Sequence, residues 1–264
     1  MKRTIITIAS LFLAATLHGA GLTDASLRAI RFDQKPGAQI SPDLLFHDED
    51  GNAVTLGDYL GRRPVILVPG YYGCPMLCTL VLNGLVESMQ DVKWTAGDQF
   101  EVINYSIDPT EKPSLAADKN STYLRRYGRA GAEHGWHFLT GNADAIAKLS
   151  DKIGFHYAYD PAIRQYAHPS GFVVLTPQGK IERYFFGVDF AGKDLDAALR
   201  SAAANEKGSR IRDLLLLCFH YSPITSKYGA LILNCVRILG TGTALFLGVW
   251  IVRSITHDRA KKPT

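Results

Sequence analysis

Residues 64–78 read PVILVPGYYGCPMLC, and the fold follows from this stretch. It opens with an apolar run, residues 64–69, that has the length of one buried strand. Residues 70–73 then supply a loop that begins and ends with glycine. From Cys78 onward, apolar side chains recur at helical spacing. The stretch therefore predicts a central strand, a loop and a helix, with Cys74 and Cys78 where the helix begins.

The segments on both sides of this stretch alternate between strand patterns and helix patterns. The predicted elements are two strands within 44–56 around Asp50-Gly51, a strand 64–69, a helix 78–90, a strand 100–107, a helix 114–127, a strand 136–139, a helix 142–153 capped by Asn142, strands 171–176 and 180–187 joined by a turn, and a helix 194–204. This order is that of an α/β, thioredoxin-like fold with an N-terminal β-hairpin extension. One domain accounts for all of these elements.

The N-terminal residues are typical of a secretory signal peptide. Lys2 and Arg3 precede a short apolar run, and small residues follow it up to Ala20. The run is short for an uncleaved membrane anchor. We therefore expect residues 1–20 to be a signal peptide that directs the chain out of the cytoplasm.

The C-terminal region contains a longer apolar run, residues 228–252, of the length of a transmembrane helix. The tail after it is basic, so the positive-inside rule places this tail in the cytoplasm. A buried core helix is the alternative for the apolar run. The predicted divisions are a signal peptide 1–20, a domain 21–207, a juxtamembrane linker 208–227, a transmembrane helix 228–252 and a cytoplasmic tail 253–264. The domain is thus expected on the periplasmic side of the cytoplasmic membrane, held by a single span.

The composition indicates a globular body and gives no sign of a nucleic-acid partner. With 264 residues, 47% of them hydrophobic, the chain is long enough to bury one sizeable core. The net charge is +4, but no basic run with interleaved aromatic residues occurs in the body. We therefore exclude nucleic-acid binding from the expected functions.

Four cysteines, at positions 74, 78, 218 and 235, are too few to build a disulfide scaffold in a body of this size. Cys74 and Cys78 can project from one face of the first helical turn. The positive end of the helix dipole is expected to lower their thiol pKa and to favour thiolates. Two thiolates suit Cu(I), and one added imidazole makes a three-coordinate site for both copper oxidation states, whereas zinc usually takes a fourth ligand.

The candidate for the imidazole is His168, within the sequence RQYAHPSGFVVL. It directly precedes the strand 171–176, which we expect to lie beside the strand 64–69. Loops at the same edge of an α/β sheet can meet although they are far apart in sequence. A loop histidine with an ordinary hydrogen bond is the alternative.

Three sequence elements occur together in a fixed order: GYYGCPMLC, then INYSIDPTEKP, then a lone histidine before PSGFVVLTPQGKI. In this respect the chain resembles the Sco (SenC) family of copper proteins over roughly residues 35 to 205. The resemblance implies that Cys74, Cys78 and His168 are copper ligands. It also implies a metallochaperone that delivers copper to the CuA site of a membrane-bound cytochrome c oxidase. The chain departs from the family at Thr79, where proline is common, and at Tyr72-Gly73 before the first cysteine.

A second function uses the same two cysteines. Cys74 and Cys78 could exchange disulfides and keep an acceptor's cysteines reduced, which would make the protein a thiol-disulfide oxidoreductase. In that case His168 would matter less. A thiol peroxidase is a third possibility, disfavoured because Pro75 follows the first cysteine in place of the usual peroxidase context.

Several other residues are weaker candidates, and each has a structural alternative. Asp108 could belong to the site or form an Asx turn, and Asp160 could orient His168 or form a turn before Pro161. His134 and His137 could form a metal pair, although no third ligand is apparent. Cys218 with His220 could be a second copper-transfer point or juxtamembrane packing, and Cys235 is expected to be a small apolar residue of the membrane helix.

Overall fold

The computed structural model describes residue 22 and residues 24–74, 77–204, 238–243, 247, 248 and 250 of the chain. The chain divides into two compact units, Met1–Gly208 and Ser209–Thr264. The predicted signal peptide, linker and tail lie outside the described residues, as does most of the predicted membrane span. Within the described part, no helix has the length and apolar character needed to cross a bilayer.

The first unit is built on a sheet of seven strands in the order β11-β10-β4-β5-β6-β2-β3. Three neighbouring strands run parallel: β4 (Val65–Gly70), β5 (Glu101–Ser106) and β6 (Trp136–Gly141). Four antiparallel strands flank them: β2 (Leu45–His47), β3 (Ala53–Thr55), β10 (Gly171–Leu175) and β11 (Ile181–Phe186). The central strands are covered on both faces, which is why their sequences are continuous apolar runs.

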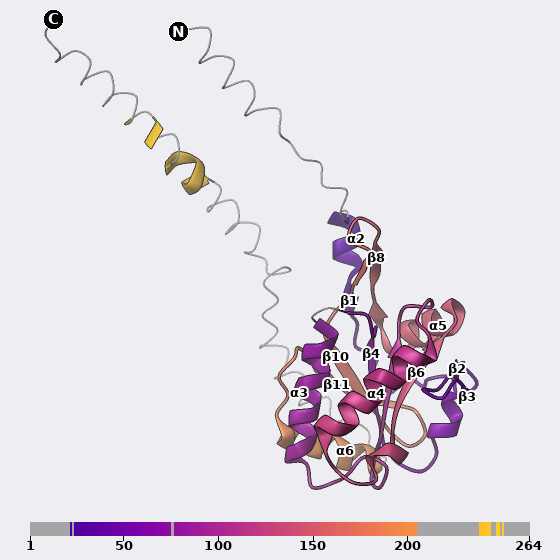
Figure 1. Ribbon diagram of the computed structural model, residues 1–264. Coiled ribbons are helices and arrows are strands. Elements are labelled where there is room, and N and C mark those ends of the chain that lie inside the picture. The colour runs from indigo at the N-terminus through magenta and orange to yellow at the C-terminus, as the bar shows by residue number, and fades with distance from the viewer. Residues whose placement is uncertain are drawn as a thin grey trace, which may run out of the picture. The chain divides into compact units, whose positions relative to one another are not determined.

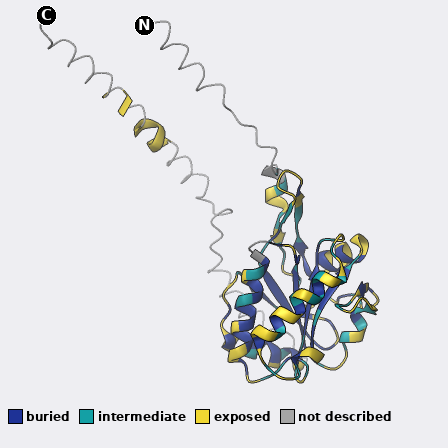
Figure 2. Ribbon diagram, in the orientation of Figure 1, coloured by how far each residue is buried: buried dark blue, intermediate teal, exposed yellow. Residues whose placement is uncertain are grey.

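Helices cover both faces of this sheet (Figure 1). On one face lie α3 (Leu77–Asp91), α4 (Pro113–Tyr127) and α6 (Gly192–Ala203), and on the other lies α5 (Ala143–Ile153). The strands between them are almost wholly buried (Figure 2). The result is a mixed α/β architecture with a central sheet, consistent with a thioredoxin-like fold.

The sequence patterns identified these elements correctly. Each strand and helix predicted within residues 44–204 is present within a few residues of its expected bounds. Asn142 caps α5 as predicted, because its side-chain oxygen accepts a hydrogen bond of 2.8 Å from the backbone N–H of Ala145. The predicted N-terminal hairpin is β2-β3, and it is an integral part of the sheet, since β2 pairs with β6.

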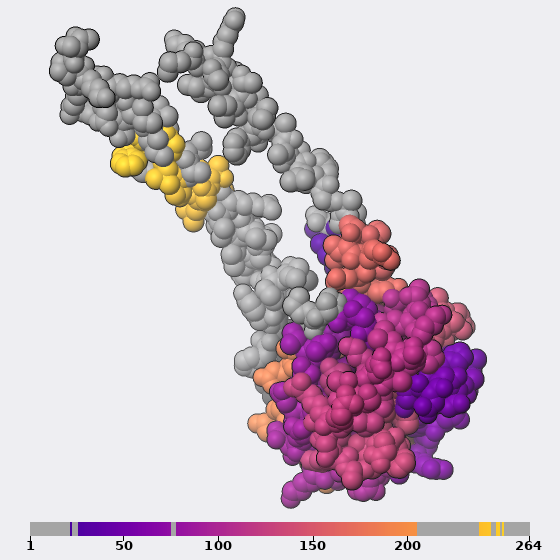
Figure 3. Space-filling view, viewed as in Figure 1, coloured from indigo at the N-terminus to yellow at the C-terminus, as the bar shows by residue number. Residues whose placement is uncertain are grey.

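Several short elements were not predicted. These are α2 (Asp24–Ala29), β1 (Arg31–Phe32), β7 (Phe155–His156), β8 (Ala158–Asp160), β9 (Gln165–Ala167) and the 3₁₀ helices Leu56–Tyr59 and Ala132–His134. Strands β8 and β9 form an antiparallel hairpin that lies against α2 and protrudes from the surface (Figure 3). This hairpin leads directly into His168, so it belongs to the surroundings of the predicted site.

Candidate metal centre

Cys74 and Cys78 lie where the chain passes from the end of β4 to the start of α3. Both are thiols outside any disulfide, with 9% and 8% of their surface exposed. The backbone N–H of Tyr71 donates to Cys78 Sγ over 3.4 Å, and the N–H of Cys78 donates to Cys74 Sγ over 3.4 Å. Each sulfur therefore accepts from a backbone N–H, and the contact from Tyr71 lowers the pKa of the Cys78 thiol, against larger effects that raise it.

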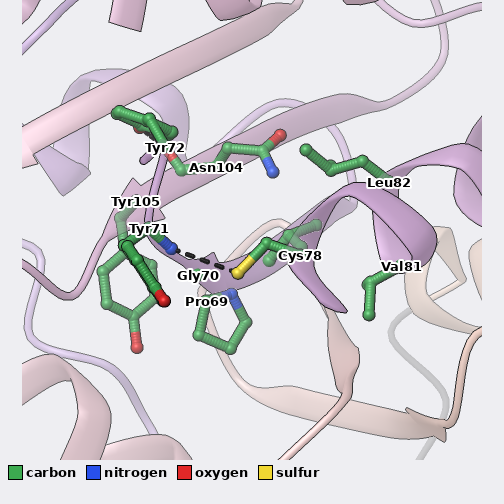
Figure 4. Close-up of a pocket in the computed structure, with 10 residues that line it drawn as sticks. Pro69, Gly70, Tyr71, Tyr72, Cys78, Val81, Leu82, Asn104 and Tyr105 are labelled. Carbon is green, nitrogen blue, oxygen red and sulfur yellow. Dashed lines mark hydrogen bonds between the residues drawn. The ribbon is translucent and has the colours of Figure 1, made fainter. Parts of the chain in front are cut away.

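A small cavity lies next to Cys78, between the end of β4 and the first turns of α3 (Figure 4). Its volume is about 20 Å³, and Tyr71, Tyr72 and Asn104 are among the residues around it. A cavity of this size holds a single water molecule. The cavity itself is therefore too small for an organic substrate.

His168 reaches the cysteines from the same edge of the sheet, where the start of β10 lies beside the end of β4. It precedes β10, and β10 pairs with β4, as the sequence predicted. His168 Nε2 lies 3.1 Å from Cys78 Sγ, and Nδ1 lies 2.8 Å from the carbonyl oxygen of Pro169. Because a carbonyl only accepts, Nδ1 carries the proton, and the lone pair of Nε2 points at the sulfur.

The three predicted residues thus form one cluster. The two sulfurs and the imidazole nitrogen all lie within 4.8 Å of one another, and all three residues are buried. Among the residues that the structure describes, this is the one group of three or more histidine, cysteine or acidic side chains so arranged. Two sulfurs with one imidazole fit a soft, three-coordinate ion and lack the fourth ligand usual for structural zinc.

The expected lowering of thiol pKa by the helix N-terminus is wrong for Cys78. A hydrogen bond with Cys74 raises the pKa of the Cys78 thiol most, and burial adds to it. Two adjacent sulfurs in a buried site resist carrying two negative charges. The pair therefore retains at least one proton at neutral pH, which an incoming cation would displace.

Aromatic rings enclose the imidazole. Tyr71 meets His168 edge to face at a ring distance of 5.8 Å, and Phe155 lies at 5.8 Å on another side. Tyr166, from β9, packs on Tyr71 at 5.5 Å. Burial raises the pKa of Tyr166 to about 12, so its hydroxyl stays neutral at physiological pH. These rings fix the orientation of His168 and limit the access of water to it.

Comparison with protein families decides the kinship of the chain. The SCO1/SenC family pattern matches residues 32–203, which is more than half of the sequence and includes the whole cluster. The chain belongs to the SCO1/SenC family. No curated protein matches it in a sequence search.

Solved structures agree with a SCO1/SenC fold. A protein from Aquifex aeolicus VF5 is 27% identical, with a TM-score of 0.56, covering 64% of this chain and 95% of that chain. A SCO1/SenC family lipoprotein from Bacillus anthracis str. Ames is 18% identical, with a TM-score of 0.52 and coverages of 64% and 98%. ScoI from Arabidopsis thaliana, solved with copper bound, is 16% identical, with a TM-score of 0.50 and coverages of 65% and 99%.

One residue beside the SCO1/SenC cluster was missed by the sequence analysis. Glu111 accepts hydrogen bonds from the backbone N–H groups of Tyr72 and Gly73, at 2.8 and 2.6 Å, and from the Ser106 hydroxyl at 2.6 Å. Burial raises the pKa of this carboxyl, and the three hydrogen bonds oppose that rise. The available signal was an acidic residue within the INYSIDPTEKP element that helped to identify the family.

Two of the weaker acidic candidates shape loops. Asp108 Oδ1 accepts from the backbone N–H and the hydroxyl of Thr110, at 2.8 and 2.7 Å, which is an Asx turn. Asp160 Oδ1 accepts from the N–H of Ala162 at 2.9 Å. The partner that orients His168 is the Pro169 carbonyl, so the proposed role of Asp160 as that partner is wrong.

The remaining candidates form no cluster with the centre. His137 Nδ1 lies 3.5 Å from Glu49, and His134 Nε2 lies 3.8 Å from Glu133. Neither belongs to a three-ligand group in the described part of the chain. The candidates Cys218, His220 and Cys235 lie outside the described residues.

Proposed function

We propose that the protein is a copper metallochaperone that delivers copper to the CuA site of a membrane-bound cytochrome c oxidase during its assembly. One observation carries this proposal: a SCO1/SenC chain brings the donor atoms of Cys74, Cys78 and His168 within 4.8 Å of one another. The copper-bound ScoI of Arabidopsis thaliana, which has the same fold, supports the choice of metal.

Copper is the cargo of this cycle. Its binding displaces the thiol protons of Cys74 and Cys78, and His168 contributes the lone pair of Nε2. Three donors leave room for a further ligand, so a thiolate of the acceptor can enter and replace the chaperone's ligands one at a time. The buried position of the three residues keeps water and competing thiols away until the acceptor docks.

We also propose that the chain works at the outer face of the cytoplasmic membrane. The support is the signal-like segment 1–20 and the apolar run 228–252 with its basic flank. A tether near the bilayer would raise the effective concentration of the chaperone around a membrane-bound oxidase. Reporter proteins fused after residue 207 and after residue 264 test this topology, because only the first should then be exported.

The decisive experiment measures copper stoichiometry and Cu(I) affinity of the full chain, by competition with a chromophoric Cu(I) chelator. Variants Cys74→Ala, Cys78→Ala and His168→Ala are compared with His134→Ala, an exposed histidine remote from the cluster. We expect one copper per chain and a loss of affinity in the first three variants alone. A chain that binds no copper, or binds it equally well without His168, would refute the proposal.

Thiol-disulfide exchange is the second candidate, favoured by the contact between the Cys78 amide and Cys74 Sγ, which holds the two thiols close together. As a reductant the pair would donate two electrons to an acceptor disulfide and become a disulfide itself. Free thiols counted before and after incubation with an oxidised dithiol peptide distinguish the two functions. Exchange that is indifferent to His168→Ala, without copper binding, would identify a dithiol reductase.

A further inference from the structure

Glu111 joins two loops that the sequence gives no reason to connect. It lies between β5 and α4, and its carboxylate reaches the loop that carries Cys74 from β4 towards α3. Oxygen Oε1 accepts from the Gly73 N–H, and Oε2 accepts from the Tyr72 N–H and the Ser106 hydroxyl. All three donors converge on the Glu111 carboxylate, and two of them, Tyr72 and Gly73, directly precede the first cysteine.

This arrangement fixes the backbone of the cysteine loop. Consecutive N–H groups bound to one carboxylate must point the same way, which sets the direction in which the chain enters Cys74. Charge-assisted hydrogen bonds of 2.6 to 2.8 Å are among the stronger ones that proteins form. The Tyr72 hydroxyl also holds the loop, through two strand carbonyls, but Gly73 is exposed and glycine has the widest conformational freedom, so the contact with Glu111 fixes a backbone that is otherwise free to vary at Gly73.

The glycine at position 73 allows the Glu111 carboxylate to lie close to the backbone. A Cβ atom placed on Gly73 would lie 3.3 Å from Glu111 Oε1, a contact tighter than most real ones. Glycine at this position therefore lets the carboxylate approach the backbone.

We propose, on the basis of the proposed copper function, that Glu111 is a positioning residue of the metal centre: it holds the Tyr72-Gly73 amides so that Cys74 Sγ faces Cys78 and His168. Residues that orient metal ligands typically change metal affinity 10- to 100-fold when they are replaced. Glu111 acts through the backbone and not through a ligand side chain. Its removal should therefore change the orientation of Cys74 Sγ in the metal-free protein too.

The test compares Glu111→Ala, Glu111→Gln and Glu182→Gln in the full chain. Glu182 is the matched control, because it is a buried carboxylate that accepts a hydrogen bond of 2.7 Å from Ser201, on β11 and α6. Glutamine keeps the shape of Glu111 but turns one acceptor into a donor that faces an N–H group or the Ser106 hydroxyl. It is therefore the milder change, and it carries the test if the alanine variant fails to fold.

Three readouts are needed: the melting temperature, the Cu(I) affinity, and the alkylation rate of Cys74 in metal-free protein, followed on its own peptide by mass spectrometry. We expect both Glu111 variants to weaken Cu(I) binding, alanine by about 10- to 100-fold and glutamine by less. We expect both to change the alkylation rate of Cys74, whereas Glu182→Gln lowers only the melting temperature.

Copper affinities within about threefold of wild type in both Glu111 variants, with an unchanged Cys74 rate, would overturn the proposal and leave Glu111 a purely structural role. The alkylation arm needs no copper. If wild-type protein binds no copper, the proposed function fails, and the Cys74 rate alone still decides whether Glu111 positions this cysteine.

Discussion

Replacing Tyr72 by phenylalanine removes one oxygen atom from beneath the cysteine loop. The Tyr72 hydroxyl lies 2.7 Å from the carbonyl oxygen of Leu139 and 3.1 Å from that of Asn104, and it donates to them. The residue is 5% exposed, and its ring packs on Phe138 at 5.6 Å. The hydroxyl thus fastens the loop to β5 and β6, two of the parallel strands of the sheet.

The expected loss of stability depends on the two carbonyl acceptors that lose the Tyr72 hydroxyl as a donor. Losing a buried hydrogen bond and leaving its acceptors unpaired lowers the free energy of unfolding by about 1–3 kcal/mol. Both acceptors here are strand carbonyls that can keep a second partner in the sheet, which favours the lower part of this range, about 1–2 kcal/mol. For a domain of this size, that corresponds to a melting temperature lower by about 2–8 °C.

Urea unfolding followed by circular dichroism measures this difference. Burial raises the pKa of Tyr72 well above its ordinary value, so the hydroxyl donates at every pH below 9 and the difference should not vary over that range. Tyr159→Phe is the control, because Tyr159 is 46% exposed and its replacement should change stability by less than about 0.5 kcal/mol. A Tyr72→Phe variant as stable as this control would show that the hydroxyl does not hold the loop.

Three further predictions test other features. Burial raises the pKa of Tyr184 from 10.0 to about 12, so the folded state keeps a proton that the unfolded state loses in this pH range. The free energy of unfolding should therefore fall as the pH rises from 10 to 12, and Tyr184→Phe should reduce this slope in urea titrations. Asn142→Ala should lower the free energy of unfolding by about 1 kcal/mol through loss of the α5 cap, while Asn142→Asp should retain most of it. Cys74→Ala removes the largest cause of the raised Cys78 pKa, so Cys78 should be alkylated faster at pH 8; an equal or slower rate would contradict the assigned cause.

The sequence was informative where apolar patterns were long. Strands β4, β5 and β10 are buried on both faces, and helix α5 has a regular apolar stripe, so each gave an unambiguous pattern. The expectation that His168 reaches the cysteines rested on placing β10 beside β4, and the pairing of these strands confirms it. Whether the three residues bind copper stays a prediction.

The missed elements lacked such patterns. Strands β8 and β9 have three residues each, too few to show a period. Their turn contains no glycine, and Arg164 adopts the left-handed conformation there, with φ of 55°. A hairpin stabilised by tertiary contacts, such as the packing of Tyr166 on Tyr71, leaves little local signal.

Two properties of the centre could not be read from spacing alone. The helix dipole argument predicted a low thiol pKa but ignored the neighbouring sulfur, whose effect on Cys78 is larger. The role of Glu111 depends on a loop crossing from one strand end to the next, and nothing in the local sequence states which backbone N–H groups it meets. Both are consequences of tertiary contacts between segments that a linear pattern does not connect.

The contact between Cys78 and His168 joins points 90 residues apart in the chain. Any ion bonded to both side chains closes a loop of that length and works as a removable cross-link. Because such an ion can leave the unfolded chain, it stabilises the fold by mass action, by about 4 kcal/mol at a free concentration 1,000 times its dissociation constant. Handing the ion to an acceptor would release this constraint, so a protein that has just delivered its cargo would be easier to unfold, and to degrade, than one still carrying it.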